Sequence, residues 1–249
     1  MTNSIGIIGQ GFVGKILKRY YPDAKVYDIV GEHDPLREVL AQQLVFVAIN
    51  FKDNCASQEN RDKLNDYFAA MKPGTLVVVK STFIPGTLDY FQDLHKHLNF
   101  VYNCEFLTEL SAWDDFTNPI YQIFGVPYQS LHLIHDLIEI SPKAPHTKII
   151  SPKDAETLKH AFNSFYSMKV IFFNQLYDAC QKLETDYETI REILVLDPRI
   201  GDSHSLVFHK GYRGYGGKCL PKDTDALRKL TEFPLLDKVA EINETLRSV

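Results

Sequence analysis

The segment Gly9-Gln10-Gly11-Phe12-Val13-Gly14 restricts the fold of this chain more than any other. It follows an apolar run that ends at Ile8 and opens an amphipathic stretch, which is the strand–turn–helix context of a dinucleotide-binding loop. The first glycine permits a tight turn, the second lets a pyrophosphate approach, and the third allows close helix–strand packing. The first turn of the helix offers N–H groups to phosphates. All six residues are therefore expected at a cofactor.

Asp28 ends the second expected strand, nineteen residues after Gly9. A carboxylate at that place accepts hydrogen bonds from a ribose 2′-hydroxyl and repels a 2′-phosphate. The expected cofactor is therefore NAD rather than NADP.

The first half of the chain alternates short apolar runs with amphipathic ones, which is typical of an α/β domain with a parallel sheet. We expect strands at Ser4–Ile8, Ala24–Tyr27, Leu44–Ile49, Leu76–Lys80, Phe100–Tyr102 and Tyr121–Phe124, and helices at Phe12–Tyr20, Pro35–Ala41, Glu59–Met71 and Thr87–His97. This pattern predicts a Rossmann-type domain over residues 1–145.

The second half of the chain has a helical pattern. Apolar residues recur at three- and four-residue steps through Asp154–Leu183, and shorter helices are expected at Tyr187–Leu194, Thr224–Thr231 and Pro234–Arg247. Prolines cluster between Ser141 and Pro152, so we place the domain boundary there and expect an all-helical domain over residues 146–249. A long helix with an apolar stripe forms the spine of a helical domain or a dimer interface.

Composition narrows the class of protein. The net charge of −5 and the pI near 6 argue against a nucleic-acid-binding surface. Neither a run of about 18 apolar residues nor a signal-peptide pattern is present, so we expect no membrane segment. The 4 cysteines are scattered, which favours a reducing, cytoplasmic compartment over a disulfide framework or a metal site.

Cys219 directly follows the glycine-rich run Gly211-Tyr212-Arg213-Gly214-Tyr215-Gly216-Gly217-Lys218. The glycines allow positive φ angles and a close approach to a ligand. Lys218 and Lys222 favour a thiolate over a thiol, and Asp223 is placed to hold a water or relay a proton. The alternative interpretation is a tight turn beside an inert cysteine.

Two polar segments follow expected strands, at the sheet edge where α/β proteins bind ligands. Ser81 and Thr82 are candidates to contact the cofactor or an ordered water, or else to cap a turn. Glu105 is a candidate general base and Glu109 a supporting acid at the cofactor site, although both also suit a solvated loop.

Lys159 and Asn163 lie four residues apart on one face of the long helix. A cation and an amide so placed can stabilise an oxyanion. The alternative is a pair of solvated side chains.

These motifs, in this order, resemble those of the UDP-glucose/GDP-mannose 6-dehydrogenase family of nucleotide-sugar dehydrogenases. The matching segments are Gly9–Gly14, Lys80-Ser81-Thr82, Asn103–Glu109, Lys159 with Asn163, and Gly214–Asp223, of which the last is the most specific. The resemblance implies a Rossmann-type domain followed by a helical domain like the central domain of 6-phosphogluconate and UDP-glucose dehydrogenases. It also implies a short form without the family's third, nucleotide-sugar-binding domain.

The resemblance implies NAD-dependent four-electron oxidation of the C6 alcohol of a nucleotide sugar to the uronic acid, with no metal. Cys219 would form a thiohemiacetal and then a thioester. The other implied roles are thioester hydrolysis for Glu105, oxyanion stabilisation for Lys159 and Asn163, and water binding for Asp223 and Thr82.

The resemblance also implies contacts with the sugar nucleotide from Arg199, Phe208, Lys210 and Gly216. Arg199 would reach into the neighbouring subunit's site, which implies a homodimer through the long helix 154–183. The chain departs from the family pattern at Cys104 and Leu110, and about four extra residues separate Arg199 from Lys210.

Two other functions stay open. A two-electron dehydrogenase of the hydroxyacid type would use Lys159 and Asn163 without Cys219. A non-catalytic relative would keep NAD binding alone.

Overall fold

The structure is a computed structural model that describes residues 4–108 and 110–248. The chain divides into two compact units, Met1–Lys159 and His160–Val249. We call them unit 1 and unit 2 and describe each by itself.

The described part of unit 1 is built on a 7-stranded sheet with the order β2-β1-β3-β4-β5-β6-β7. The strands are β1 (Ile5–Ile8), β2 (Lys25–Tyr27), β3 (Leu44–Val47), β4 (Leu76–Val79), β5 (Asn99–Tyr102), β6 (Tyr121–Gly125) and β7 (His146–Ile150). The chain passes from β2 across β1 to β3, so the strand order reverses beside β1. Ligands of open α/β sheets bind at such a reversal, next to the carboxyl ends of the strands.

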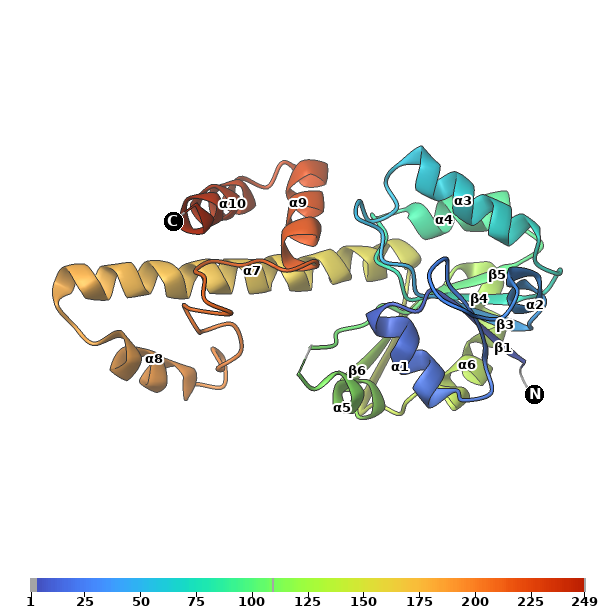
Figure 1. Ribbon diagram of the computed structural model, residues 1–249, viewed down its shortest axis with the longest axis horizontal. Helices are drawn as coiled ribbons and strands as arrows, with labels where there is room; N and C mark the ends of the chain where they lie inside the picture. Colours follow the sequence, from blue (N-terminus) through green and yellow to red (C-terminus); the bar gives the residue numbers. More distant parts are fainter. Residues whose placement is uncertain (1–3, 109, 249) are drawn as a thin grey trace. The chain divides into compact units, whose positions relative to one another are not determined.

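Helices cover both faces of this sheet (Figure 1). They are α1 (Phe12–Tyr20), α2 (Leu36–Leu40), α3 (Gln58–Ala69), α4 (Thr87–Leu94), α5 (Ala112–Thr117), the 3₁₀ helix η1 (Tyr128–Leu133) and α6 (Ile134–Ile140). Alternate strand residues point to opposite faces. Val45 and Val47 pack in the core with α3 and α4, and Leu44 and Phe46 pack in the core with α1 and α6.

Unit 2 is helical. Helix α7 (Pro152–Leu183) begins in unit 1 and continues into unit 2, which also holds α8 (Tyr187–Val195), α9 (Leu220–Thr231) and α10 (Pro234–Arg247). Val170 and Ile171 of α7 form one small core with Tyr215 and Val239. Phe173 and Cys180 form a second with α8, and Figure 1 shows α8 and α10 on different sides of α7.

The predicted fold class is confirmed, with two differences. The sheet is mixed, because β6 runs antiparallel to β5 and β7 parallel to β6. The boundary predicted between residues 145 and 146 lies elsewhere, because β7 belongs to the sheet and the units divide after Lys159. Four of the five residues of β7 are exposed, so this edge strand shows no apolar alternation. The prolines that flank it, Pro142, Pro145 and Pro152, make the segment resemble a linker in sequence.

Glu156 fastens the start of α7 to α4 within unit 1. Its carboxyl group is fully buried and accepts the backbone N–H groups of Gly86 (2.5 Å) and Leu88 (2.8 Å). Desolvation raises the pKa of Glu156 to about 8, against the opposing effect of these N–H groups.

We predict that unit 1 loses stability as pH rises from about 5 to 8. The folded state keeps the Glu156 proton that the unfolded chain releases near its ordinary pKa, so stability falls by up to about 1.4 kcal/mol per pH unit in that window. Glu156→Gln removes this titration and flattens the profile. Urea unfolding followed by fluorescence of Trp113, the single tryptophan, measures both proteins. Equal pH slopes for the two would contradict the assignment.

Candidate active site

The loop between β1 and α1 is held in place by contacts that only glycine allows. Gly9 has φ +101° and donates its N–H to the carbonyl of Tyr27 at 2.8 Å. A Cβ on Gly14 would lie 1.8 Å from the carbonyl oxygen of Gly9. The side chain of Gln10 closes the turn by donating to the carbonyls of Gly9 and Gly14, both at 3.2 Å.

The N-terminus of α1 is open to a ligand. Gly11 is its N-cap, no side chain caps the helix, and its first turn contains no acidic residue. A Cβ on Gly11 would meet no heavy atom within 4 Å. Of the remaining motif residues, Phe12 is exposed and Val13 packs against the core. The free N–H groups and the helix dipole here suit a pyrophosphate.

Asp28 makes contacts within the protein that the sequence does not predict, and its contact with a ribose stays a prediction. Its carboxylate accepts the N–H groups of Gln10 (2.5 Å) and Val30 (2.9 Å). Burial acts to raise the pKa of Asp28, but these hydrogen bonds outweigh it and lower the pKa. Each carboxylate oxygen has a further lone pair, so the group can also accept a ribose hydroxyl.

Glu105 lies after β5 in a buried ion pair. The ammonium of Lys80, at the end of β4, donates to the carboxylate of Glu105 and to the side-chain oxygen of Asn103. The two charged side chains are 3% and 12% exposed. Lys159 donates to the backbone carbonyl of Glu105 at 2.7 Å, so it is not the solvated side chain of the alternative interpretation. Lys80 belongs to the matching segment Lys80-Ser81-Thr82, but the sequence assigns it no role; its place at the end of an apolar strand is the signal that identifies it.

The other predicted residues of unit 1 are less engaged. The hydroxyl of Ser81 is buried and donates to the carbonyl of Val47 at 3.2 Å, which ties it to β3. Thr82 is partly buried beside it, and a cofactor contact from either residue stays a prediction. Glu109 lies outside the described residues.

In unit 2, a buried carboxylate stands one helical turn after an exposed thiol. Cys219 is exposed at the N-cap of α9, and its carbonyl accepts the N–H of Asp223 at 3.0 Å. Asp223 is 1% exposed and accepts a hydrogen bond from the amide of Asn163 at 2.5 Å. Lys222 places its ammonium 3.6 Å from the other oxygen of Asp223.

His160 lies beside Asp223, and no sequence motif identifies it. It is completely buried, and its Nδ1 lies 3.3 Å from the backbone carbonyl of Asp223. The contact shows that the ring faces the first turn of α9, but it identifies no chemical role for His160.

The predicted substrate residues also lie in unit 2, on or near its surface. Arg199 pairs with Asp197 at 2.5 Å and leaves 88% of its side chain exposed. Phe208 is 58% exposed and touches the ring of Tyr177, and Lys210 has φ +54°. A Cβ on Gly216 would lie 3.0 Å from the guanidinium of Arg247, so a larger residue fits only if that side chain moves slightly.

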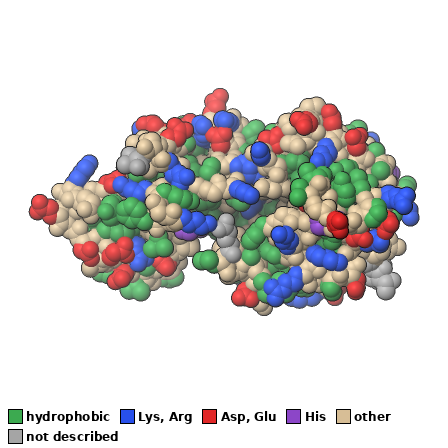
Figure 2. All heavy atoms as spheres, in the orientation of Figure 1, with side chains coloured by type: hydrophobic (Ala, Val, Ile, Leu, Met, Phe, Trp, Pro, Cys, Tyr) green, Lys and Arg blue, Asp and Glu red, His purple; other side chains and the backbone are tan. Residues whose placement is uncertain are grey.

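The surface and the side-chain clusters add two observations. Lys, Arg, Asp and Glu side chains are interspersed over the face in Figure 2, rather than separated by sign. Within residues 4–108 and 110–248, no helix is both long and apolar enough to cross a bilayer, and no three metal-binding side chains gather.

Residues 153–245 match the central domain of the UDP-glucose/GDP-mannose dehydrogenase family. Two curated relatives are UDP-glucose 6-dehydrogenases. That of Rhizobium meliloti is 31% identical over 214 residues, 78% of this chain and 47% of the relative. That of Rickettsia conorii is 31% identical over 180 residues, 71% of this chain and 41% of the relative.

The chain belongs to the UDP-glucose/GDP-mannose dehydrogenase family. It spans about half the length of the curated relatives it matches, or less. A solved UDP-glucose dehydrogenase from Pyrobaculum islandicum shares the fold, with a TM-score of 0.80 at 23% identity over 98% of this chain and 68% of that one. Family membership and fold therefore rest on both halves of this chain.

We predict that Lys80→Met lowers the free energy of unfolding of unit 1 by about 3–5 kcal/mol, because it leaves the buried Glu105 carboxylate without its cation. Lys80→Met with Glu105→Gln recovers part of this loss, since no buried charge is then unpaired. Urea unfolding by Trp113 fluorescence gives both values. A double variant no more stable than the single one would refute the ion pair as the cause.

Proposed function

We propose that this chain carries out NAD-dependent four-electron oxidation of the C6 alcohol of a nucleotide sugar, of the UDP-glucose class, to the uronic acid. One observation carries the proposal: an exposed cysteine at the start of α9, one turn before a buried carboxylate that an amide orients. The names of the two curated relatives support the substrate class.

The residues around α1 fit NAD. Gly11 leaves space where a larger residue would stand, and the first turn of α1 presents N–H groups to the pyrophosphate. Asp28 binds the adenosine ribose. When bound, NAD⁺ accepts a hydride in each of the two oxidations.

Cys219 is the proposed nucleophile. Once the C6 alcohol has lost a hydride to the bound cofactor and its hydroxyl proton to solvent, the thiolate adds to the carbon of the resulting aldehyde, and the carbonyl oxygen becomes the alkoxide of a thiohemiacetal. The second oxidation leaves a thioester, and water cleaves the C–S bond to give the acid and the free thiol. Asp223 and Thr82 each provide a hydrogen bond to water, and Glu105 assists its deprotonation.

Lys159 and Asn163 are the proposed oxyanion stabilisers. The ammonium of Lys159 spends one of its three donors on the carbonyl of Glu105, and the amide of Asn163 has a second N–H besides the one given to Asp223. Each residue therefore keeps a donor for the developing negative charge.

The proposal includes a homodimer and a cytoplasmic location. Phe165 and Phe172, seven residues apart on α7, are each 58% exposed, which suits a partner helix better than water. In the dimer, Arg199 serves the neighbouring subunit, and Phe208, Lys210 and Gly216 contact the sugar nucleotide.

We predict two NADH per sugar consumed when the protein is given UDP-glucose or a panel of nucleotide sugars. Cys219→Ser forms no acid, because serine lacks the thioester step. Mass spectrometry of the wild-type protein with NAD⁺ and sugar finds an acyl adduct on Cys219. A fully active Cys219→Ser variant indicates the two-electron hydroxyacid chemistry instead, and NAD binding without turnover indicates a non-catalytic relative.

We predict that substitutions at two glycines of the same loop affect different properties, one NAD binding and the other stability. Gly11→Ala folds normally but weakens NAD binding by about tenfold or more, because its methyl group occupies the pyrophosphate's place. Gly14→Ala destabilises unit 1 by roughly 1–3 kcal/mol, because its Cβ overlaps the Gly9 carbonyl. Calorimetric titration with NAD⁺ and urea unfolding separate the two. Unimpaired NAD binding by Gly11→Ala would exclude this loop as the cofactor site.

A further inference from the structure

The glycine-rich loop 211–218 is held by two asparagines that the proposed chemistry does not use. Asn243 of α10 accepts the backbone N–H of Tyr215 at 2.7 Å and donates to the carbonyl of the same residue at 3.1 Å. One side-chain amide thereby pairs with both backbone groups of Tyr215, as a neighbouring strand would.

Asn174 of α7 holds the preceding residues. It is completely buried, and its Nδ2 donates to the carbonyl of Val170 at 2.9 Å, which fixes the orientation of the amide. Its oxygen accepts the N–H of Gly214 at 3.3 Å and the Nε of Arg213 at 3.1 Å. The loop is therefore attached to α7 and to α10 at adjacent residues.

The loop sequence is adapted to these contacts. Gly214 has φ +73°, and a Cβ on it would lie 2.5 Å from the side-chain oxygen of Asn243. One turn after Asn243, the guanidinium of Arg247 lies 3.7 Å from the centre of the Tyr212 ring. Only glycine at 214 lets α10 approach the loop this closely.

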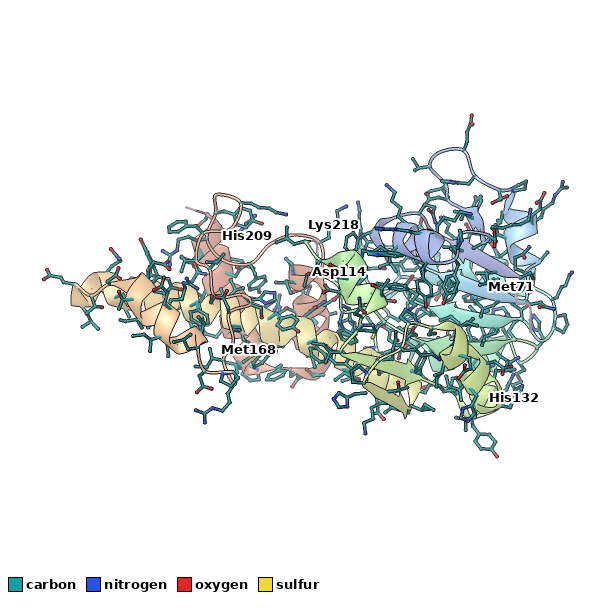
Figure 3. The ribbon with its side chains drawn as sticks, turned by 90° about the horizontal axis from the view of Figure 1, so that it is seen from below. Met71, Asp114, His132, Met168, His209 and Lys218 are labelled. Atoms are coloured by element: carbon teal, nitrogen blue, oxygen red, sulfur yellow. The ribbon has the colours of Figure 1, made fainter. Side chains whose placement is uncertain are left out.

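Cys219 follows the loop directly, and Lys218, the last residue of the loop, is exposed (Figure 3). Glycines give a free loop more backbone conformations than any other residue. The asparagine contacts remove that freedom just before the cysteine.

We propose that Asn243 and Asn174 are positioning residues that set the conformation of the loop and, through it, the reactivity of Cys219. The effect of these two asparagines on catalysis rests on the proposed function, but their effect on the Cys219 thiol does not. Lys218, the last residue of the loop, precedes Cys219 at the N-cap of α9, so a fixed loop also fixes the position of the sulfur.

The test uses Asn243→Ala and Asn243→Asp in the full chain, with Glu241→Ala, at an exposed residue of the same helix, as the matched control. Hydrogen exchange of residues 211–218 and iodoacetamide alkylation of Cys219 are measured against pH. Cys55, Cys104 and Cys180 are buried, so mass spectrometry assigns the rapidly alkylated site.

We expect Asn243→Ala to speed exchange of the loop about tenfold. We expect the rate of Cys219 alkylation in this variant to change by at least about threefold at neutral pH, because the sulfur is no longer held in one position. Asn243→Asp keeps the acceptor for Tyr215 and gives intermediate values, and Glu241→Ala matches the wild type.

Unchanged alkylation and exchange in Asn243→Ala would overturn the proposal. If Asn243→Ala melts at a much lower temperature, Asn174→Ser, which breaks the second attachment, supplies the same readouts. The exchange and alkylation measurements need no sugar substrate. A protein inactive on every nucleotide sugar would therefore refute the proposed function without changing the result for the loop. In an active protein, kcat falls at least tenfold in Asn243→Ala while the affinity for NAD⁺ stays unchanged.

Discussion

The close contact between the backbones of Gly9 and Gly14 decides where the first helix begins. Because neither residue has a side chain in the gap, α1 starts directly against the end of β1 and presents its N–H groups at the reversal of strand order. Asp28, from the end of β2, then reaches the backbone of Gln10. The proposed nucleotide site is thus a consequence of packing, and the groups that it would offer to an anion are backbone N–H groups at the start of α1.

The carboxylates of Glu105 in unit 1 and Asp223 in unit 2 are held by different means. In unit 1 a lysine neutralises Glu105, which makes the pair stable only while both charges are present. In unit 2 a neutral amide orients Asp223, and the ammonium of Lys222 lies 3.6 Å from its other oxygen. That second oxygen is buried and accepts no hydrogen bond within the part of the chain that the structure describes. It is therefore the oxygen to which we assign the proposed water binding.

The sequence predicts the central part of the fold well, because β1, β3 and β4 are short apolar runs buried on both faces. Edge strand β7 escapes prediction because its side chains meet solvent, and α5 and α6 lie in a stretch without strong caps. Motif residues such as Cys219 and Asp223 are found from their neighbours in sequence. Asn243 is not, because its partner lies 28 residues away and nothing local distinguishes it from a solvated asparagine.

The two edge strands of the sheet affect how readily the protein associates with itself. The edge strand β7 follows Pro145 and exposes His146 and Lys148. The edge strand on the other side of the sheet is β2, which carries Lys25. At β2 the backbone of Val26 is already bonded to Asp34, which accepts its N–H at 2.8 Å and donates to its carbonyl at 2.9 Å. At β7 the exposed ammonium of Lys148 opposes the addition of a strand from another molecule, because the added strand would desolvate it. Concentrated solutions of this protein should therefore resist fibrous aggregation through the sheet, even though the 7-stranded sheet ends in an edge strand on each side.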